Sequence, residues 1–145
     1  MTDILDNAVR HLFLLRRHVL QTLDKALALH GLSHGTYKYL YALYIEDRRS
    51  QQAIADRLGD DKGAATRALT RLEDQGLIRR EPHPDDKRVV VVSLTSAGNA
   101  LRQEIVAAVT EASLSMTSGL DANDAATFTT LLAKAVSHIH PPEQP

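Results

Sequence analysis

The sequence predicts a mainly α-helical fold that carries one small β-hairpin. Apolar residues recur at helical spacing through most of the 145 residues, and only residues 77–80 and 89–94 are rich in the branched side chains that favour strands. Glycines interrupt the pattern at Gly31, Gly59 and Gly76, where helices are expected to end. These observations divide the chain into a long first helix, a central block of short elements and two further helices.

The first helix is expected over residues 3–30, where apolar side chains keep helical spacing for about seven turns without proline or glycine. Such a long stripe exceeds what one small domain covers. The helix is therefore either an extended core helix or one that also packs on a second subunit. A second helix is expected over residues 34–46, with Ser33 as its N-cap.

The residues from Ser50 to Gly76 predict two short helices joined by a tight turn. Ser50 suits an N-cap position, and Gly59 suits the left-handed conformation that ends a helix. The second helix has an apolar face and an opposite polar and basic face, made of Lys62, Thr66, Arg67, Thr70 and Arg71. A helix, a glycine-containing turn and a helix with a basic outer face are typical of a helix-turn-helix, in which the second helix enters the major groove of DNA.

Two strands are expected next, at residues 77–80 and 89–94. Pro82 and Pro84, which lie between them, are expected to prevent regular strand pairing, and residues 85–88 supply a charged tip. A basic hairpin directly after a recognition helix is a wing, which can place an arginine in the minor groove or along the phosphates. The central block is therefore predicted to be a winged helix-turn-helix.

Two more helices are expected after the wing. Thr95 caps the first, over residues 96–117, and Asp121 caps the second, which begins near Ala122. The second helix is expected to bury one apolar face, made of Phe128, Leu131, Leu132, Ala135, Val136 and Ile139. Residues 141–145 are expected to be a loose tail. No repeat, low-complexity tract or linker interrupts residues 1–145, so the chain is predicted to be a single domain.

Several motifs in the central block are more specific than the helical pattern. They are Ala55-Asp56-Arg57-Leu58, Thr66-Arg67, the run LEDQGLIRR at 72–80, Pro84-Asp85-Asp86-Lys87-Arg88 and the run VSLTSAG at 92–98. With these motifs the chain resembles the MarR (multiple-antibiotic-resistance regulator) family of winged-helix transcription factors. The resemblance implies that Asp86 braces the wing and that Arg88 approaches the minor groove.

The resemblance also implies how the outer helices are used. In this family such segments interleave with those of a second copy in an obligate homodimer. Residues 1–32 and 96–140 would then be dimerisation helices around a winged helix-turn-helix at 33–95. The apolar stripes agree, because three of them need more partner surface than one winged helix offers. A two-fold dimer would set its recognition helices about 34–36 Å apart and would bind a pseudo-palindromic operator.

Basic residues are concentrated where DNA would lie. The chain has a net charge of −1, but ten of its 17 lysines and arginines lie from Arg48 to Arg88 against eight acids, which gives this block +2 (10 − 8). Binding depends on the position of charge more than on its sum. The value of +2 is modest, and four acids lie near the expected phosphates: Asp60, Asp61, Asp85 and Asp86. Nonspecific affinity is therefore expected to be weak and strongly salt-dependent.

The expected DNA contacts gather on the recognition helix, the helix before it and the wing. They are Lys62, Ala64, Thr66, Arg67 and Arg71 on the recognition helix, Ser50, Gln51 and Gln52 at the phosphates, Arg88 in the minor groove, and Arg79, Arg80 and Lys87 on the DNA backbone. A lone arginine is more often a solvated charge or the partner of an acid such as Glu73 or Asp74. The concentration of arginines on one helix and one hairpin favours DNA instead.

The start of the recognition helix offers few groups that read bases. Gly63-Ala64-Ala65 leaves the Ala64 methyl as a contact for thymine. Specificity is therefore expected to depend on Arg67, the wing and DNA shape.

A small-molecule effector is the other expected partner. The resemblance implies a pocket between the dimerisation helices and the winged helix that often receives small aromatic acids. The candidates here are His11, Arg16, His18, Tyr37 and Tyr41, since a cation and tyrosines suit an aromatic carboxylate. Tyr37 and Tyr41 share a helix face and are equally explained as core residues.

No metal site or cofactor is expected. His30 and His34 are four residues apart but are separated by the Gly31 turn, and no other pair of the seven histidines has the spacing that sets two ligands side by side on a helix. The chain has no cysteine, which excludes disulfides and thiol-based redox sensing.

The sequence therefore predicts a homodimeric, sequence-specific DNA-binding regulator, a repressor that a small aromatic or phenolic acid releases from its operator. The alternative is a dimeric metal-responsive or protein-interaction module with weak DNA readout. An enzyme is not expected, because the sequence shows no glycine-rich phosphate loop, nucleophile elbow or paired carboxylates. No apolar run approaches the roughly 20 residues of a membrane span, and the N-terminus lacks a signal-peptide pattern, so a cytoplasmic location is expected.

Overall fold

The computed structural model describes residues 2–141, with side chains from residue 7 on. The predicted loose tail at 142–145 lies outside the described residues. The elements in chain order are α1 (Thr2–Leu27), a 3-10 turn η1 (Ala28–His30), α2 (Tyr37–Ile45), β1 (Arg49–Ser50), α3 (Gln51–Leu58), α4 (Lys62–Asp74), β2 (Ile78–Pro82), β3 (Val90–Leu94), α5 (Ser96–Ala100), α6 (Arg102–Met116) and α7 (Ala122–Ile139).

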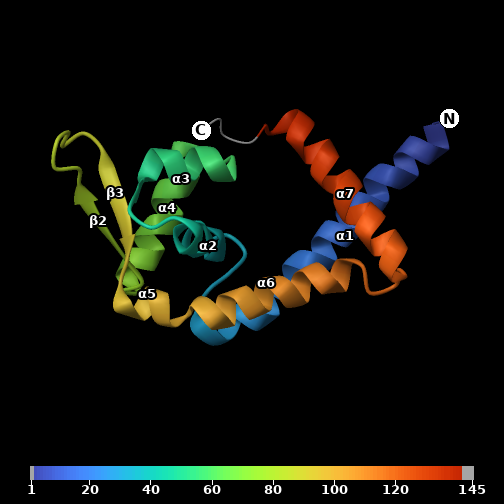
Figure 1. The fold of residues 1–145 in the computed structure, drawn as a ribbon, viewed down its shortest axis with the longest axis horizontal. Coiled ribbons are helices and arrows are strands. Elements are labelled where there is room, and N and C mark those ends of the chain that lie inside the picture. The colour runs from blue at the N-terminus through green and yellow to red at the C-terminus, as the bar shows by residue number, and fades with distance from the viewer. Residues whose placement is uncertain (1, 142–145) are drawn as a thin grey trace.

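The fold is mainly helical with one small antiparallel sheet, as predicted. The helices α2, α3 and α4 gather with the β2–β3 hairpin at one end of the molecule, and α7 crosses α1 at the other end (Figure 1). The helices α1 and α6 pack along each other and join the two ends. No helix in the described part of the chain is both long and apolar enough to cross a membrane.

The core lies where the winged end meets α1 and α6. Its largest fully buried side chains come from α1, α2, α4, β2, β3 and α6, and they are Leu27, Tyr39, Leu40, Leu43, Leu69, Leu72, Ile78, Val92 and Ile105. Burial of large apolar side chains at this junction holds α4 and the hairpin on one rigid base.

The sheet has three strands in the order β1-β3-β2, one more than the sequence predicted. The missed strand β1 is two residues long and pairs Arg49 with Val92 on β3. The expectation that Pro82 prevents pairing is wrong, because Pro82 ends β2 opposite Val90. A proline is tolerated there because β2 is an edge strand, so its missing amide need not donate to a neighbour.

The second helix begins at Tyr37 and not at residue 34, and Ser33 is not its cap. The Ser33 amide instead donates to Thr36 Oγ1 at 3.1 Å, and the Ser33 carbonyl accepts from the amides of Thr36 and Tyr37 at 3.1 and 3.0 Å. These local bonds form a turn before the helix, which a cap prediction from residue type does not distinguish from a helix start.

The helix predicted over 96–117 is two helices, which meet at Leu101. In a continuous helix the Gly98 carbonyl would accept from the amide of Arg102. Here the Tyr44 hydroxyl donates to that carbonyl at 2.7 Å, and the Arg102 guanidinium donates to the Tyr44 carbonyl at 2.7 Å. Contacts with α2 therefore stabilise the break, which directs α6 along α1.

The apolar face of α7 is exposed in the chain, so the prediction that this helix buries it is wrong for a single copy. Asp121 caps α7 as predicted, with Oδ1 accepting from the Asp124 amide at 2.9 Å. No residue of α7 is buried, and Leu131 and Ile139 are 58% and 80% exposed. The helix has only the outer part of α1 to cross, which cannot cover its whole stripe.

Candidate DNA-binding surface

The recognition helix α4 begins at a turn that is defined on both sides. Gly59 ends α3 with a φ of 69°, in the left-handed region that favours glycine. Asp61 then caps α4, because its Oδ1 accepts from the Ala64 amide at 2.8 Å. The turn therefore fixes Lys62 as the residue at which α4 begins.

The two faces of α4 are separated as the sequence predicted. Ala65, Leu69 and Leu72 are buried against the core. The opposite face is exposed and carries Lys62, Thr66, Arg67 and Arg71, while Ala64 is half-buried. In the described part of the chain none of the three cations on this face makes an ion pair, so each is available to an external anion.

The helix α3 is attached to this face by its first residues. Ser50 caps α3 by accepting from the Ala53 amide at 3.1 Å. Gln51 Nε2 donates to Thr66 Oγ1 at 3.0 Å, and Thr66 Oγ1 in turn donates to the Lys62 carbonyl at 2.8 Å. These bonds orient the Thr66 hydroxyl and tie the start of α3 to α4. Gln52 is exposed and donates to Asp56 at 2.7 Å within its own helix.

The wing is ordered by one aspartate and one arginine. Asp86 accepts from the Arg88 amide at 3.1 Å and from the Arg88 guanidinium at 3.0 and 3.1 Å. These hydrogen bonds hold the pKa of Asp86 below its usual value, and they raise the pKa of Arg88. The Arg88 side chain is 92% exposed, so its guanidinium is presented to solvent at the tip of the hairpin.

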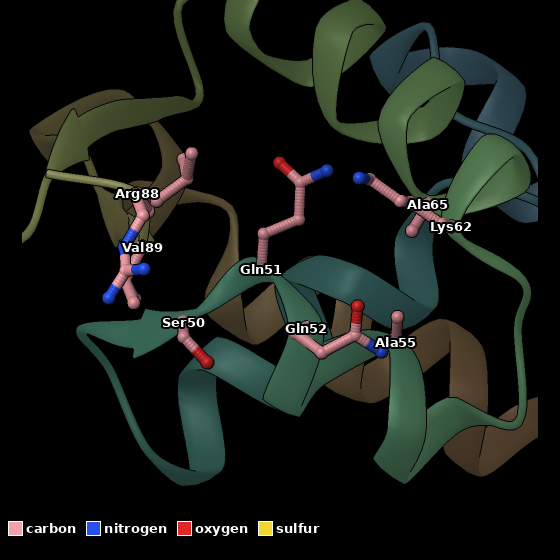
Figure 2. A pocket seen from close by; sticks show the side chains of 9 residues that line it. Ser50, Gln51, Gln52, Ala55, Lys62, Ala65, Arg88 and Val89 are labelled. Carbon is pink, nitrogen blue, oxygen red and sulfur yellow. The ribbon is translucent and has the colours of Figure 1, made fainter. Parts of the chain in front are cut away.

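A hollow of about 280 Å³ lies between the helix-turn-helix and the wing. Its walls come from the start of α3, the start of α4 and the wing, and they are Ser50, Gln51, Gln52, Ala55, Lys62, Ala65, Arg88, Val89 and Val90. Figure 2 shows the Gln51 amide and the Lys62 ammonium directed toward the same space, with Arg88 across from them on the wing. The structure therefore brings residues from three separate predicted groups around one hollow.

A second, smaller hollow of about 170 Å³ lies on the other side of α4. It separates α4 from the turn before α2 and is lined by Ser33, Gly35, Thr36, Ala64, Arg67, Ala68 and Arg71. Lys62 and the Arg67–Arg71 pair thus flank the recognition helix, which gives it positive charge on both sides.

Arg80 lies apart from the other predicted contacts. Its guanidinium donates to Glu73 Oε2 at 2.8 and 3.1 Å and to Thr70 Oγ1 at 3.1 Å, and its side chain is only 20% exposed. The hydrogen bonds from Arg80 hold the pKa of Glu73 below its usual value. Arg80 therefore joins β2 to α4, whereas its neighbour Arg79 and the wing residue Lys87 are exposed.

The five residues predicted to bind an effector do not share one pocket. His11 and Arg16 line an apolar cavity of about 400 Å³ between α1, the end of α6 and α7. His18 is exposed on α1 and does not line that cavity. Tyr37 and Tyr41 lie on α2, packed against the core of the winged end.

The sequence reasoning missed the acidic and basic partners of the turn before α4. Lys38 Nζ donates to Asp60 Oδ1 at 2.8 Å, and the hydroxyl of the buried Tyr39 donates to Asp60 Oδ2. In the sequence, Tyr39 differs from the other three tyrosines only in that it lies off the helix face that they share. His34 is likewise paired, with Asp24, at 2.9 Å. Among the described residues no group of three His, Cys, Asp or Glu side chains could hold a metal ion.

Known proteins share this arrangement. A model of the MarR family matches residues 32–90. The multiple antibiotic resistance protein MarR of Escherichia coli is 39% identical over 80 residues, which are 54% of this chain and 56% of that protein. The organic hydroperoxide resistance transcriptional regulator of Bacillus subtilis is 32% identical over 76 residues, or 52% of each chain. The chain spans about half the length of the curated relatives it matches.

Solved structures match over nearly the whole chain. A MarR transcriptional regulator from Methanosarcina mazei superposes with a TM-score of 0.82 at 26% identity, covering 94% of this chain and 96% of that one. A mutant MarR from E. coli in complex with operator DNA superposes with a TM-score of 0.83 at 26% identity, covering 94% and 98%. The likeness therefore includes the outer helices as well as the winged end.

Proposed function

Because the chain belongs to the MarR family, we propose that it is a transcriptional regulator that binds double-stranded DNA through α4 and the wing. The observation that carries this proposal is the hollow between α3, α4 and the wing, which Gln51 and Lys62 border from the two helices and Arg88 borders from the wing. Proteins of the MarR family are transcriptional regulators and not enzymes, in agreement with the expectation from the sequence.

In the proposed complex α4 enters the major groove. Its exposed face presents Thr66 and Arg67 to base edges, and Lys62 and Arg71 to phosphates on either side. Arg88, held by Asp86 at the hairpin tip, enters the adjacent minor groove, where a guanidinium is attracted to the negative potential of a narrow groove.

Of the remaining basic residues, two are placed to contact the DNA backbone and one is not. Arg79 and Lys87 are exposed and unpaired within the described part of the chain, so they suit phosphates. Arg80 is instead assigned to bracing the wing base, since its guanidinium already bonds Glu73 and Thr70. Its loss would act on affinity through the position of the hairpin.

We propose that the protein acts as a homodimer. Large apolar side chains are exposed along both α1 and α7, among them Leu12, Phe13, Leu131, Val136 and Ile139. A second copy would remove these stripes from water, and contiguous exposed apolar surface of this kind marks an interaction site. A two-fold dimer would set two copies of α4 about 34–36 Å apart, which favours a pseudo-palindromic operator.

We further propose that the regulator is a repressor that a small aromatic acid releases in the cytoplasm. The apolar cavity of about 400 Å³ at α1, α6 and α7 supports this, because His11 and Arg16 border it and could pair with a carboxylate. A ligand there lowers DNA affinity only if it favours a different separation of the two α4 helices.

The first test is selection of duplexes from a randomised DNA library by the purified protein. Fluorescence anisotropy then compares the selected duplex with a scrambled one at two salt concentrations. We expect a pseudo-palindromic selected site and a preference that persists near physiological salt. Equal binding to both duplexes that disappears with salt would refute sequence-specific regulation and favour an interaction module.

The second test addresses the site residues and the dimer separately. Arg67→Ala and Arg88→Ala are expected to weaken binding to the selected duplex while sedimentation shows an unchanged assembly. Leu131→Asp with Val136→Asp is expected to give monomers, because two charges on an interface stripe cannot be buried without partners. Unchanged affinity in the arginine variants would refute the site assignment, and an unchanged assembly in the aspartate variant would refute the dimer surface.

A further inference from the structure

The turn between α3 and α4 is tied to α2 by one carboxylate. Asp60 is the single residue between Gly59, which ends α3, and Asp61, which caps α4. Its Oδ1 accepts from Lys38 Nζ at 2.8 Å, its Oδ2 lies 2.7 Å from the same nitrogen, and the Tyr39 hydroxyl also donates to Oδ2. Lys38 and Tyr39 both belong to the first turn of α2.

This cluster differs from an ordinary surface ion pair. Tyr39 is 0% exposed, so its ring is fixed by packing and its hydroxyl has one direction in which to donate. The side chain of Asp60 is 19% exposed, and two different donors converge on it. Exposed ion pairs contribute little because solvent screens them and because their side chains are free to move. Here the side chains of Asp60 and Lys38 are only 19% and 30% exposed and the Tyr39 ring is buried, so both effects are weaker than at an exposed pair.

The charge on Asp60 is also compensated. Burial alone would raise the pKa of Asp60, but hydrogen bonds from Lys38 and Tyr39 hold it below the usual value for an aspartate. The carboxylate is therefore ionised and neutralised by an ammonium, although it stands one residue before the cap of the recognition helix. This acid was expected from the sequence to repel phosphates, and the structure gives it a partner instead.

We propose that Lys38, Tyr39 and Asp60 are positioning residues that fix the start of α4 relative to α2, and that they thereby set the orientation in which α4 meets DNA. The inference rests on the proposed function, since it assigns the cluster a role in sequence-selective binding. The Asp60 amide also donates to the Ala55 carbonyl at 3.0 Å, so backbone and side chain together restrain this residue. Because hydrogen bonds to both its backbone and its side chain restrain Asp60, the turn holds α4 in one orientation.

The decisive experiment compares Asp60→Asn with Asp61→Asn. Each variant removes one negative charge from the same turn. Asparagine caps a helix as well as aspartate does, so Asp61→Asn changes the charge and keeps the cap. Both carboxylate oxygens of Asp60 lie within 2.8 Å of Lys38 Nζ. An asparagine at position 60 therefore places its NH2 group, a donor, against the ammonium and removes the negative charge that pairs with it. Charge alone predicts that both variants bind DNA more tightly, whereas positioning predicts opposite signs.

We expect Asp61→Asn to bind selected and scrambled duplexes more tightly, and Asp60→Asn to bind the selected duplex about tenfold more weakly than the wild type, the scale of one lost charge-assisted hydrogen bond. Tyr39→Phe keeps the buried ring and removes the hydroxyl. It should show the same loss of preference for the selected duplex, measured well below its thermal midpoint, with little change for the scrambled duplex.

Hydrogen–deuterium exchange of the free protein provides a readout that does not need DNA. Tyr39→Phe is expected to speed exchange of the amides that open α4, including those of Ala64 and Ala65, and to leave α5 unchanged. Unchanged exchange at these amides would overturn the proposal. Tighter binding of Asp60→Asn to both duplexes would also overturn the proposal. So would a lower thermal midpoint of Asp60→Asn and Tyr39→Phe if both variants kept the wild-type preference for the selected duplex. A wild type without preference would refute the proposed function instead, and the exchange data would still decide whether the cluster holds α4.

Discussion

Replacement of Gly98 by alanine tests how closely the wing base packs on α5. A Cβ at this position would lie 2.0 Å from the Leu77 carbonyl oxygen and 3.0 Å from its carbon. Both atoms belong to the backbone, so no side-chain rotation relieves the contact. The chain must separate α5 from the start of β2 by about 1.5 Å to reach an ordinary contact distance.

The magnitude follows from two opposed contributions. Alanine is favoured over glycine in a helix by about 1 kcal/mol, which by itself predicts stabilisation. Overpacking a closed site typically costs about 1–3 kcal/mol, and here the shift also strains the bonds from Thr95 to the Leu77 carbonyl (3.1 Å) and from the Tyr44 hydroxyl to Gly98 (2.7 Å). Weakening these two hydrogen bonds adds about 1 kcal/mol to the cost, so we expect a net loss of about 1–3 kcal/mol, or roughly 3–9 °C in the thermal midpoint for a domain of this size.

Thermal unfolding followed by circular dichroism measures this change at a fixed protein concentration, which matters if the protein is a dimer. Gly119→Ala is the matched control, because a Cβ there meets nothing within 4 Å and the residue does not require positive φ. It should be neutral or stabilise slightly by restricting the unfolded chain. A Gly98→Ala protein that is as stable as the wild type would refute the close approach of α5 to Leu77.

The remaining predictions concern the wing. Arg80→Ala should lower the free energy of unfolding by about 1 kcal/mol, a value reduced because its partner Glu73 is 37% exposed, whereas Arg79→Ala should leave thermal stability unchanged. The pKa of Glu73 lies below its usual value of 4.5 because of the Arg80 hydrogen bond. The stabilisation by this pair is therefore complete above about pH 4.5 and is lost as the pH falls through the lowered pKa. Acid unfolding of Arg80→Ala should lack this part of the pH dependence. Arg88→Ala should weaken binding to the selected duplex roughly tenfold and reduce the salt slope by about 1 in anisotropy titrations, and an unchanged salt slope would place Arg88 away from DNA. Asp86→Asn should weaken binding less than Arg88→Ala, because it frees the arginine without removing its charge.

The local elements were predictable because the chemistry that defines them is local. Ser50, Thr95 and Asp121 cap helices in the structure as their residue types predicted, since an N-cap needs only a side-chain oxygen and the next few amides. The apolar face of α4 was predictable for the same reason, as was the hairpin.

Two of the features that were mispredicted, the helix break at Leu101 and the role of Arg80, depend on contacts with other elements. The helix break at Leu101 requires the hydroxyl of Tyr44, a residue 54 positions away from its acceptor Gly98, and no periodicity within 96–117 indicates it. Arg80 and Arg79 are equivalent in sequence, but strand alternation directs one toward Glu73 and leaves the other exposed.

The sequence by itself determined which segments are helices, which face of α4 is basic and, through short motifs, which family the chain resembles. Only the tertiary structure decided which of the charges are free. Lys62, Arg67 and Arg71 remain unpaired within the described residues. The acid at position 60 is instead paired with Lys38 and accepts a hydrogen bond from Tyr39, both on another helix. The physical reason is that a charge acts according to its partners and its burial, and both are set by packing between elements that the sequence places far apart.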